Sequence, residues 1–195
     1  SKKDNLFKDL ITGFNVYYPP GGYMVTREAF EKSIPSKQIY ETYIGQNWQM
    51  MLPIAYNYKC GYINEILFTY VVRKGSHSRT GNEKERMLKK INEKENTIIT
   101  VINDIDMPDE IKQKYIEMVK ELYAEKRIIN YYKSSDIQNI KKEYENIKTM
   151  CKKVTLKEKI IYCSTKGKIM KIICKILYIM IRLAERIKEK ILIYI

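Results

Sequence analysis

The chain has 195 residues, of which 45% are hydrophobic and 30% are charged, and its formal net charge is +13. This length and composition predict a soluble protein with one compact domain and an appendage. The four cysteines form no Cys-x-x-Cys pair and have no histidine nearby, which argues against a zinc site and a disulfide framework and favours a reducing cytoplasm.

Positive charge is concentrated near the end of the chain. Residues 1–80 carry 10 basic and 6 acidic side chains, residues 81–145 carry 13 and 14, and residues 146–195 carry 13 and 3. A basic tail of this kind attracts polyanions through a field that does not depend on sequence. The two common polyanions are nucleic acid and the inner face of a membrane, and composition alone leaves both open.

Residues 1–80 hold most of the glycine and proline. The sequence "YYPPGGY" at 17–23 predicts a turn, because proline and glycine set the backbone angles there. The apolar spacing after Gly45 predicts a helix, with Pro53 expected only in its first turn. The sequence "GYINEILFTYVVRKGSHS" at 61–78 predicts one or two short strands, because aromatic and β-branched residues lie between two glycines.

From Gly81 onward the sequence is typical of helices. Capping residues predict four of them, which begin at Asn82, at Asp106 with Pro108, at Ser134 or Ser135, and at about Thr165. The chain is therefore predicted to have three regions: a tyrosine-rich region over 1–80, a helical extension over 81–155, and a basic amphipathic C-terminal helix over 156–195.

The sequence "GQNWQ" at 45–49 contains the only tryptophan of the chain. At the start of a helix, the amides of Gln46 and Asn47 and the backbone N–H groups converge on one point, which is a common way to hold the hydroxyls of a polyol. Trp48 would add an apolar face for a sugar ring. The alternative is that Asn47 is an ordinary N-cap and Trp48 an ordinary core anchor.

Residues 17–79 resemble the second half of the catalytic domain in the family 2 inverting glycosyltransferases of the GT-A fold, in the branch that builds polysaccharides. Three pieces carry the resemblance in the family's order and spacing: "GGYMVTREAF", "GQNWQMMLPIAY" and "YINEILFTYVVRKGSHSRT". The resemblance implies an α/β fragment, a partial GT-A (Rossmann-like) acceptor-side region with short strands. A mainly α-helical C-terminal extension would follow it.

The same resemblance implies a function. Family members transfer a sugar from a nucleotide-sugar donor to a glycan or lipid-linked acceptor in cell-surface polysaccharide synthesis, with a divalent metal, Mg or Mn. No stretch of residues 1–40 matches the Val/Ile-rich strand or the Asp-x-Asp motif of the family's donor-binding half. We therefore expect an acceptor-side fragment of a longer enzyme, inactive by itself. The alternative is a non-enzymatic membrane-binding or helical interaction module.

The resemblance also assigns roles to residues on the acceptor side. The position of the family's catalytic base matches Asn47, an amide that cannot accept a proton near neutral pH. Either Asn47 only orients the acceptor, or a nearby carboxylate such as Glu41 is the base. Acceptor contacts are expected from the amide and indole of the motif and from two glycines that permit close approach of the backbone: Gln46, Trp48, Gly21 and Gly22.

His77 is the only histidine and lies in the polar sequence "KGSHSRT". In the resembling enzymes this region reaches toward the donor diphosphate and the metal. His77 is therefore a candidate metal ligand or diphosphate contact, and Arg73 or Arg79 would offset phosphate charge. The alternative is that His77 is a plain surface residue.

Residues 165–195 predict an amphipathic helix with a narrow polar stripe and broad apolar faces. Lysines at 171 and 175 interrupt any stretch long enough to span a bilayer, so a helix lying in the membrane interface is favoured. This predicts a cytoplasmic protein that is peripheral to the membrane. A helix packed on the catalytic domain or on a second subunit is the alternative. The broad apolar face argues against nucleic acid. The stripe comprises Lys168, Lys171, Lys175, Arg182, Arg186 and Lys190.

Overall fold

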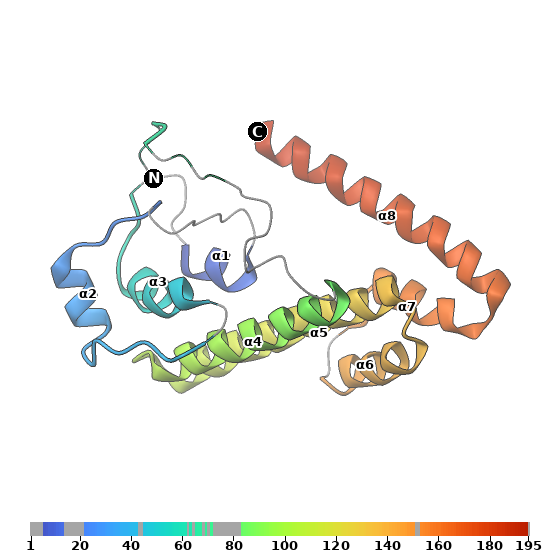
Figure 1. Ribbon diagram of the computed structural model, residues 1–195, viewed down its shortest axis with the longest axis horizontal. Coiled ribbons are helices and arrows are strands. Elements are labelled where there is room, and N and C mark those ends of the chain that lie inside the picture. The colour runs from blue at the N-terminus through green and yellow to red at the C-terminus, as the bar shows by residue number, and fades with distance from the viewer. Residues whose placement is uncertain are drawn as a thin grey trace. The chain divides into compact units, whose positions relative to one another are not determined.

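The computed structural model describes residues 6–13, 22–42, 45–61, 63, 65–67, 69, 71, 83–150 and 153–194. The structure is 76% helical, and its described residues contain no strand (Figure 1). The chain forms two compact units, Ser1–Leu122 and Tyr123–Ile195, and the boundary falls within helix α5 (Asp109–Ser134). Each unit is described separately below.

The predicted α/β fold, a partial GT-A (Rossmann-like) region, is wrong. The described residues of the stretch 61–71 form no strand, and the remainder of the predicted strand segment, residues 72–78, lies outside the described part. A strand is stable only when its backbone pairs with a neighbouring strand and its apolar face is covered. Neither condition is met within the described residues, and the side chains of Ile66 and Leu67 are largely exposed.

The first unit is built around helix α3 (Gln46–Asn57). This helix packs against α1 (Leu6–Thr12), α2 (Arg27–Ser33) and α4 (Glu83–Asp104), which surround it in Figure 1. Apolar residues from these helices and from the first part of α5 form the core of the unit. Its fully buried members include Leu10, Ile11, Leu52, Ile98, Ile102 and Val119.

Helix α3 tolerates a proline in its interior. Pro53 was expected in the first turn but lies in the eighth of the twelve positions of the helix. Proline has no N–H, so the carbonyl of Gln49 receives no helical hydrogen bond from this position. Pro53 itself is buried, and its carbonyl accepts a hydrogen bond of 2.9 Å from the side chain of Asn57. Burial in the core holds the helix together despite the missing hydrogen bond.

The long helices after residue 80 follow the predicted pattern. Helix α4 spans Glu83–Asp104, and Ile98, Val101 and Ile102 are buried at the three- and four-residue spacing of one helix face. Helix α5 begins at Asp109, immediately after Pro108, as proline predicts at a helix start. These two predictions are confirmed because a helix is specified mainly by local signals.

The second unit contains the last part of α5 together with α6 (Ile137–Thr149), α7 (Leu156–Cys163), a short 3-10 turn and α8 (Lys168–Tyr194). Its core cluster takes two residues from α5, two from α6 and one from α7: Ala124, Ile128, Ile140, Ile147 and Ile161.

Local capping signals define the helices of this unit. Asp136, rather than Ser134 or Ser135, caps α6 by accepting a hydrogen bond from the N–H of Asn139. Helix α7 was not predicted, although Thr155 and Glu158 form a complete capping box at its start. The Thr-x-x-Glu spacing was therefore an available signal that the sequence analysis missed.

Two ion-pair arrangements link the helices of the second unit. Arg127 Nε on α5 lies 3.0 Å from Glu143 Oε1 on α6, and both side chains are nearly buried. Lys157 Nζ on α7 lies 3.0 Å from Glu125 Oε1 and 3.2 Å from Glu185 Oε1. Burial acts to lower the pKa of the Lys157 ammonium, but the two carboxylates outweigh it and the pKa is raised. Lys157 therefore joins α5, α7 and α8.

Candidate functional site

The "GQNWQ" sequence begins helix α3 with an unusual backbone conformation. Gly45 is the N-cap and has φ of 95°, in the left-handed region that favours glycine. A Cβ placed on Gly45 would lie 3.4 Å from the Cγ2 of Thr97, so the start of α3 approaches α4 closely. Asn47 is not the N-cap, which excludes one part of the alternative interpretation of this motif.

Gln49 uses its amide to hold the segment that precedes α3. Its side chain is buried, its Oε1 accepts a hydrogen bond of 2.7 Å from the N–H of Tyr40, and its Nε2 donates to the carbonyl of Tyr40 at 3.0 Å. Nε2 also lies 3.2 Å from the hydroxyl of Thr42. Gln46 donates to the carbonyl of Thr42 at 2.8 Å. Both glutamines therefore hold residues 40–42 in place.

Asn47 and Trp48 join α3 to other segments of the unit. The Oδ1 of Asn47 accepts a hydrogen bond of 3.0 Å from the hydroxyl of Tyr23. The indole Nε1 of Trp48 donates to the carbonyl of Leu10 at 2.8 Å, and the Nζ of Lys94 lies 3.8 Å from the ring centroid. Trp48 is half-buried, and the ammonium covers one face of its ring. These contacts agree with the core-anchor interpretation of Trp48.

An open groove lies beside this motif. It has a volume of about 370 Å³, within the range of small-molecule sites. Its lining offers two carboxylates, one amide, three threonine hydroxyls and a tyrosine ring, a set of hydrogen-bonding groups suited to a polyhydroxylated ligand. One wall is the segment before α3 and the other is α4: Tyr40, Glu41 and Thr42 face Glu93, Asn96, Thr97 and Thr100.

Glu93 is the residue of this groove that the sequence analysis missed. Its Oε2 atom is buried and has no hydrogen-bond partner among the described residues, whereas its Oε1 lies 3.6 Å from the Nζ of Lys89. A buried carboxylate oxygen without a donor is costly, and within the described residues nothing offsets that cost for Oε2. The spacing of Glu93, Thr97 and Thr100 on one face of the predicted helix was the signal available in the sequence.

Glu41 is the carboxylate that the sequence analysis named as an alternative catalytic base. It is exposed and lines the groove directly before the start of α3, between Tyr40 and Thr42. The hydroxyl of Tyr40 donates a hydrogen bond to the carboxylate of Asp104, and this bond raises the pKa of Tyr40. The segment that carries Glu41 is thus held to both α3 and α4.

The other predicted site residues divide into two groups. Gly22 is described and exposed, and its neighbour Tyr23 makes the hydrogen bond to Asn47, so the two predicted acceptor segments meet. The remaining four lie outside the described residues: Gly21, Arg73, His77 and Arg79. The described residues contain no group of three or more His, Cys, Asp or Glu side chains that could hold a metal ion, and the metal role of His77 stays a prediction.

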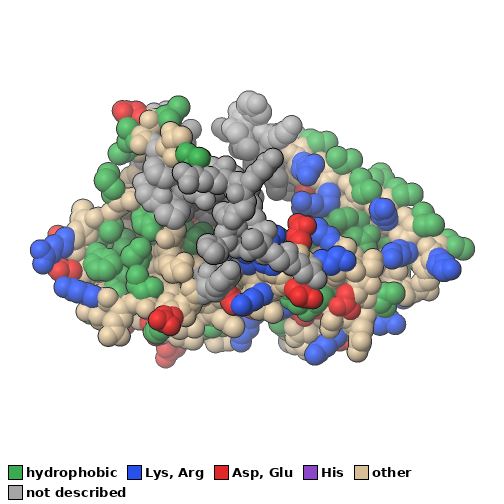
Figure 2. All heavy atoms as spheres, in the orientation of Figure 1, with side chains coloured by type: hydrophobic (Ala, Val, Ile, Leu, Met, Phe, Trp, Pro, Cys, Tyr) green, Lys and Arg blue, Asp and Glu red, His purple; other side chains and the backbone are tan. Residues whose placement is uncertain are grey.

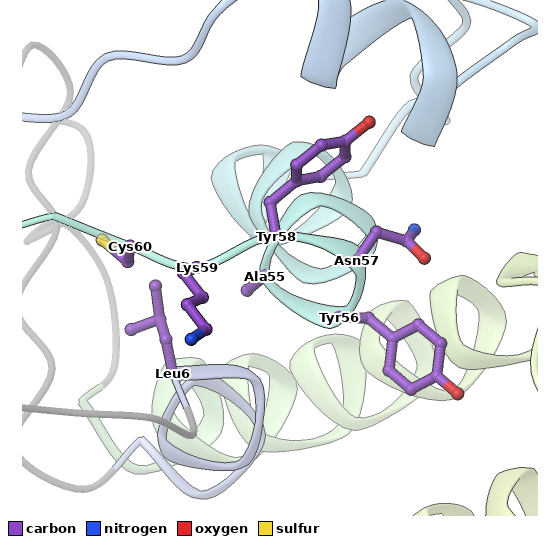
Figure 3. Close-up of a pocket in the computed structure, with 7 residues that line it drawn as sticks. All are labelled: Leu6, Ala55, Tyr56, Asn57, Tyr58, Lys59 and Cys60. Carbon is purple, nitrogen blue, oxygen red and sulfur yellow. The ribbon is translucent and has the colours of Figure 1, made fainter.

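A second cavity at the other end of α3 is a weaker candidate. It has a volume of about 160 Å³, below the usual range for a ligand site, and residues of α1 and of the C-terminal end of α3 line it. Figure 3 shows the ring of Tyr56 pointing away from Leu6 and Cys60. The ring of Tyr56 instead meets Phe7 edge to face, with centroids 5.3 Å apart.

Helix α8 in the second unit is a different kind of surface. Large apolar side chains are exposed along most of its described length, together with lysines and arginines (Figure 2). Across the part of the chain that the structure describes, no helix combines the length and the apolar character needed to cross a bilayer.

Comparisons of the chain with family models, with curated proteins and with solved structures gave no match.

Proposed function

We propose that this chain is the acceptor-side part of a family 2 inverting glycosyltransferase that transfers a sugar from a nucleotide-sugar donor to a glycan or lipid-linked acceptor. The sequence resemblance over residues 17–79 supports this proposal. The structural observation that carries it is the groove between residues 40–42 and α4, which brings the carboxylates of Glu41 and Glu93 to one site. The strands that the resemblance implies are absent from the described residues, so the proposal depends on this groove.

Glu41 would be the general base. Its carboxylate accepts the proton of the acceptor hydroxyl while the hydroxyl oxygen attacks the anomeric carbon of the donor sugar. The bond between that carbon and the nucleoside diphosphate breaks, and the diphosphate leaves with the electron pair. A carboxylate can take the proton, whereas the amide of Asn47 cannot. Asn47 is held by Tyr23 and so would be a positioning residue.

Glu93 and the threonines would orient the acceptor. The carboxylate of Glu93, whose Oε1 lies 3.6 Å from the Nζ of Lys89, can accept a hydrogen bond from one sugar hydroxyl, and Asn96 can donate to another. The exposed ring of Tyr40, held by its bond to Asp104, offers an apolar face at the groove. Trp48 joins α3 to α1 and does not line the groove, so it would not contact the sugar.

The donor side stays a prediction. Arg73, His77 and Arg79 are expected near the diphosphate and a divalent metal, and all three lie outside the described residues. Because residues 1–40 match none of the family's donor motifs, the purified chain is expected to show no measurable affinity for uridine-diphosphate sugars with manganese. A micromolar dissociation constant in isothermal titration would contradict this expectation.

Acceptor binding can be tested with the intact chain. A panel of bacterial-type oligosaccharides is titrated against the protein and followed by nuclear magnetic resonance. We expect at least one to bind, and Glu93→Gln should weaken that binding by roughly tenfold or more, because a hydrogen bond to a charged group is replaced. The matched control is Glu65→Gln, which changes an exposed carboxylate outside the groove and should leave binding unchanged.

Two results would overturn the acceptor proposal. One is that no oligosaccharide of the panel binds. The other is that Glu93→Gln and Glu65→Gln bind as the unmodified chain does. In an enzyme that also contains a donor half, Glu41→Gln should lower kcat more than it raises KM, since the base acts in the transition state. An unchanged kcat would remove Glu41 from the chemistry.

A further inference from the structure

Helix α8 is attached to the rest of its unit by one face only. Cys174 is buried there, and the ring of Tyr178 lies 5.0 Å from that of Tyr132, centroid to centroid. Glu185 on the same face bonds to Lys157 at 3.2 Å. The spacing of these residues, four and seven, is that of a single helix face. The rotation of α8 about its axis is therefore set by its own unit.

The opposite face of α8 is apolar and exposed. Over the described side chains, at 100° per residue, this face covers about half of the helix circumference. Its residues recur at each turn across five turns, so they form a continuous surface along the helix, part of which is visible in Figure 2. The exposed members are Ile169, Met170, Ile172, Ile173, Ile176, Leu177, Ile179, Met180, Leu183 and Ile187.

A row of cations borders this apolar surface. Lys168, Lys175, Arg182 and Arg186 are separated by seven, seven and four residues, so they lie nearly in line along one edge. The only acidic residue in the described side chains of α8 is Glu185, which is already bonded to Lys157 and to Arg182. The outward charge beside the apolar surface is therefore positive.

We propose that α8 lies in the interface of a bilayer that contains anionic lipids. Its apolar surface would enter the boundary of the acyl chains, while the cation row would contact lipid phosphates. Charge decides the occupant: anionic headgroups neutralise the cation row, whereas a second copy of α8 brings no free negative charge to it, since Glu185 of the described side chains is already bonded. Anionic lipids are characteristic of the cytoplasmic leaflet, which is the expected side.

This proposal does not rest on the transferase assignment. The acceptor groove is in the first unit and α8 is in the second, so saccharide binding and vesicle binding can fail independently. The chemistry that recognises the membrane is general: apolar burial, which salt does not screen, and attraction between cations and phosphate, which salt does screen.

Cosedimentation of the intact chain with vesicles tests the proposal. Vesicles of phosphatidylcholine with phosphatidylglycerol should bind the chain at least tenfold more tightly than vesicles of phosphatidylcholine alone. Added salt should weaken the binding without abolishing it. Replacing Lys168 and Lys175 together by Gln should weaken it roughly 25-fold, because each cation near an anionic surface contributes a factor of about five.

Apolar variants separate the membrane from other occupants. The double variant Ile172→Ser/Ile176→Ser should lose most vesicle binding, whereas Ile111→Ser, which changes an exposed apolar residue on α5, should not. Circular dichroism should show the same helix content for all three proteins. Sedimentation velocity without lipid should show the same oligomeric state for the unmodified chain and for the double variant.

Equal binding to neutral and anionic vesicles would overturn the proposal, and so would the absence of binding to either. A dimer that the double variant Ile172→Ser/Ile176→Ser separates, in a chain that does not bind vesicles, would assign the apolar surface to a second copy instead. Retention of vesicle binding by the double variant would equally remove α8 as the docking surface.

Discussion

Helices α3 and α8 differ in how their side chains are used. Helix α3 carries the recognisable "GQNWQ" motif, and its amides and indole bond to Thr42, Tyr23, Tyr40 and Leu10. Helix α8 contains no comparable motif, yet ten large apolar side chains among its described residues are exposed beside a cation row. Conspicuous residues in α3 hold the fold together, while ordinary isoleucines and lysines in α8 are left exposed.

The difference follows from the surroundings of each helix. Helix α3 is packed against α1, α2 and α4, so both its apolar residues and most of its polar residues find partners. Up to residue 187, where its side chains are described, helix α8 is packed along one narrow face and most of the other side chains are exposed. Substitutions in α3 should therefore reduce stability, and substitutions on the outer face of α8 should not.

The largest expected effect is at Trp48. Trp48→Ala should lower the free energy of unfolding by about 3 kcal/mol, because it removes ring packing and the hydrogen bond to Leu10. Trp48→Phe keeps a ring and should lower it by only about 1 kcal/mol. Urea denaturation followed by circular dichroism measures both. A loss below about 0.5 kcal/mol in the alanine variant would contradict the anchoring role and favour contact with a ligand.

The next effect is at Gln49. Gln49→Ala should lower the free energy of unfolding by about 2 kcal/mol, because the N–H and carbonyl of Tyr40 lose their partner within the unit. The matched control is Gln46→Ala, since Gln46 is exposed and its loss should change stability by less than about 0.5 kcal/mol. Tryptophan fluorescence during denaturation reports on both. Equal effects would mean that burial does not distinguish the two glutamines.

A smaller effect is expected at Gly45. Gly45→Ala should lower the free energy of unfolding by about 1 kcal/mol, since an alanine at φ of 95° is strained. Its Cβ would meet Thr97 only at 3.4 Å, so the backbone angle is the main cause. Gly61→Ala serves as the comparison, because a Cβ there meets nothing within 4 Å. Thermal denaturation that gives the same midpoint for both variants would refute the strain.

The smallest effect on stability is expected for a substitution on the exposed face of α8. Ile176→Ser should change the free energy of unfolding by less than about 0.5 kcal/mol, because its side chain is already exposed. Ile161→Ala, a substitution at a fully buried isoleucine of the same unit, should cost about 3 kcal/mol. Denaturation of the two variants in parallel measures the difference. A large loss in Ile176→Ser would show that the outer face of α8 is covered within the folded chain.

Part of the candidate site was accessible from the sequence. Glu41 was proposed because a carboxylate was needed near Asn47, and it does line the groove between residues 40–42 and α4. The groove itself depends on α4, whose Glu93 lies some fifty residues further along the chain. Such proximity arises only when α3 and α4 pack together, so no local pattern could pair Glu41 with Glu93.

The sequence by itself determined the long helices α4 and α5, because helical hydrogen bonds join residues four apart and capping signals act within one turn. It did not determine strands in residues 61–71, since a strand needs a partner that may lie anywhere in a fold. Only the tertiary structure decided which polar groups of "GQNWQ" are used internally and which face of α8 is left open. Both outcomes depend on contacts between segments that are distant in sequence. The spacing of neighbouring residues cannot predict such contacts.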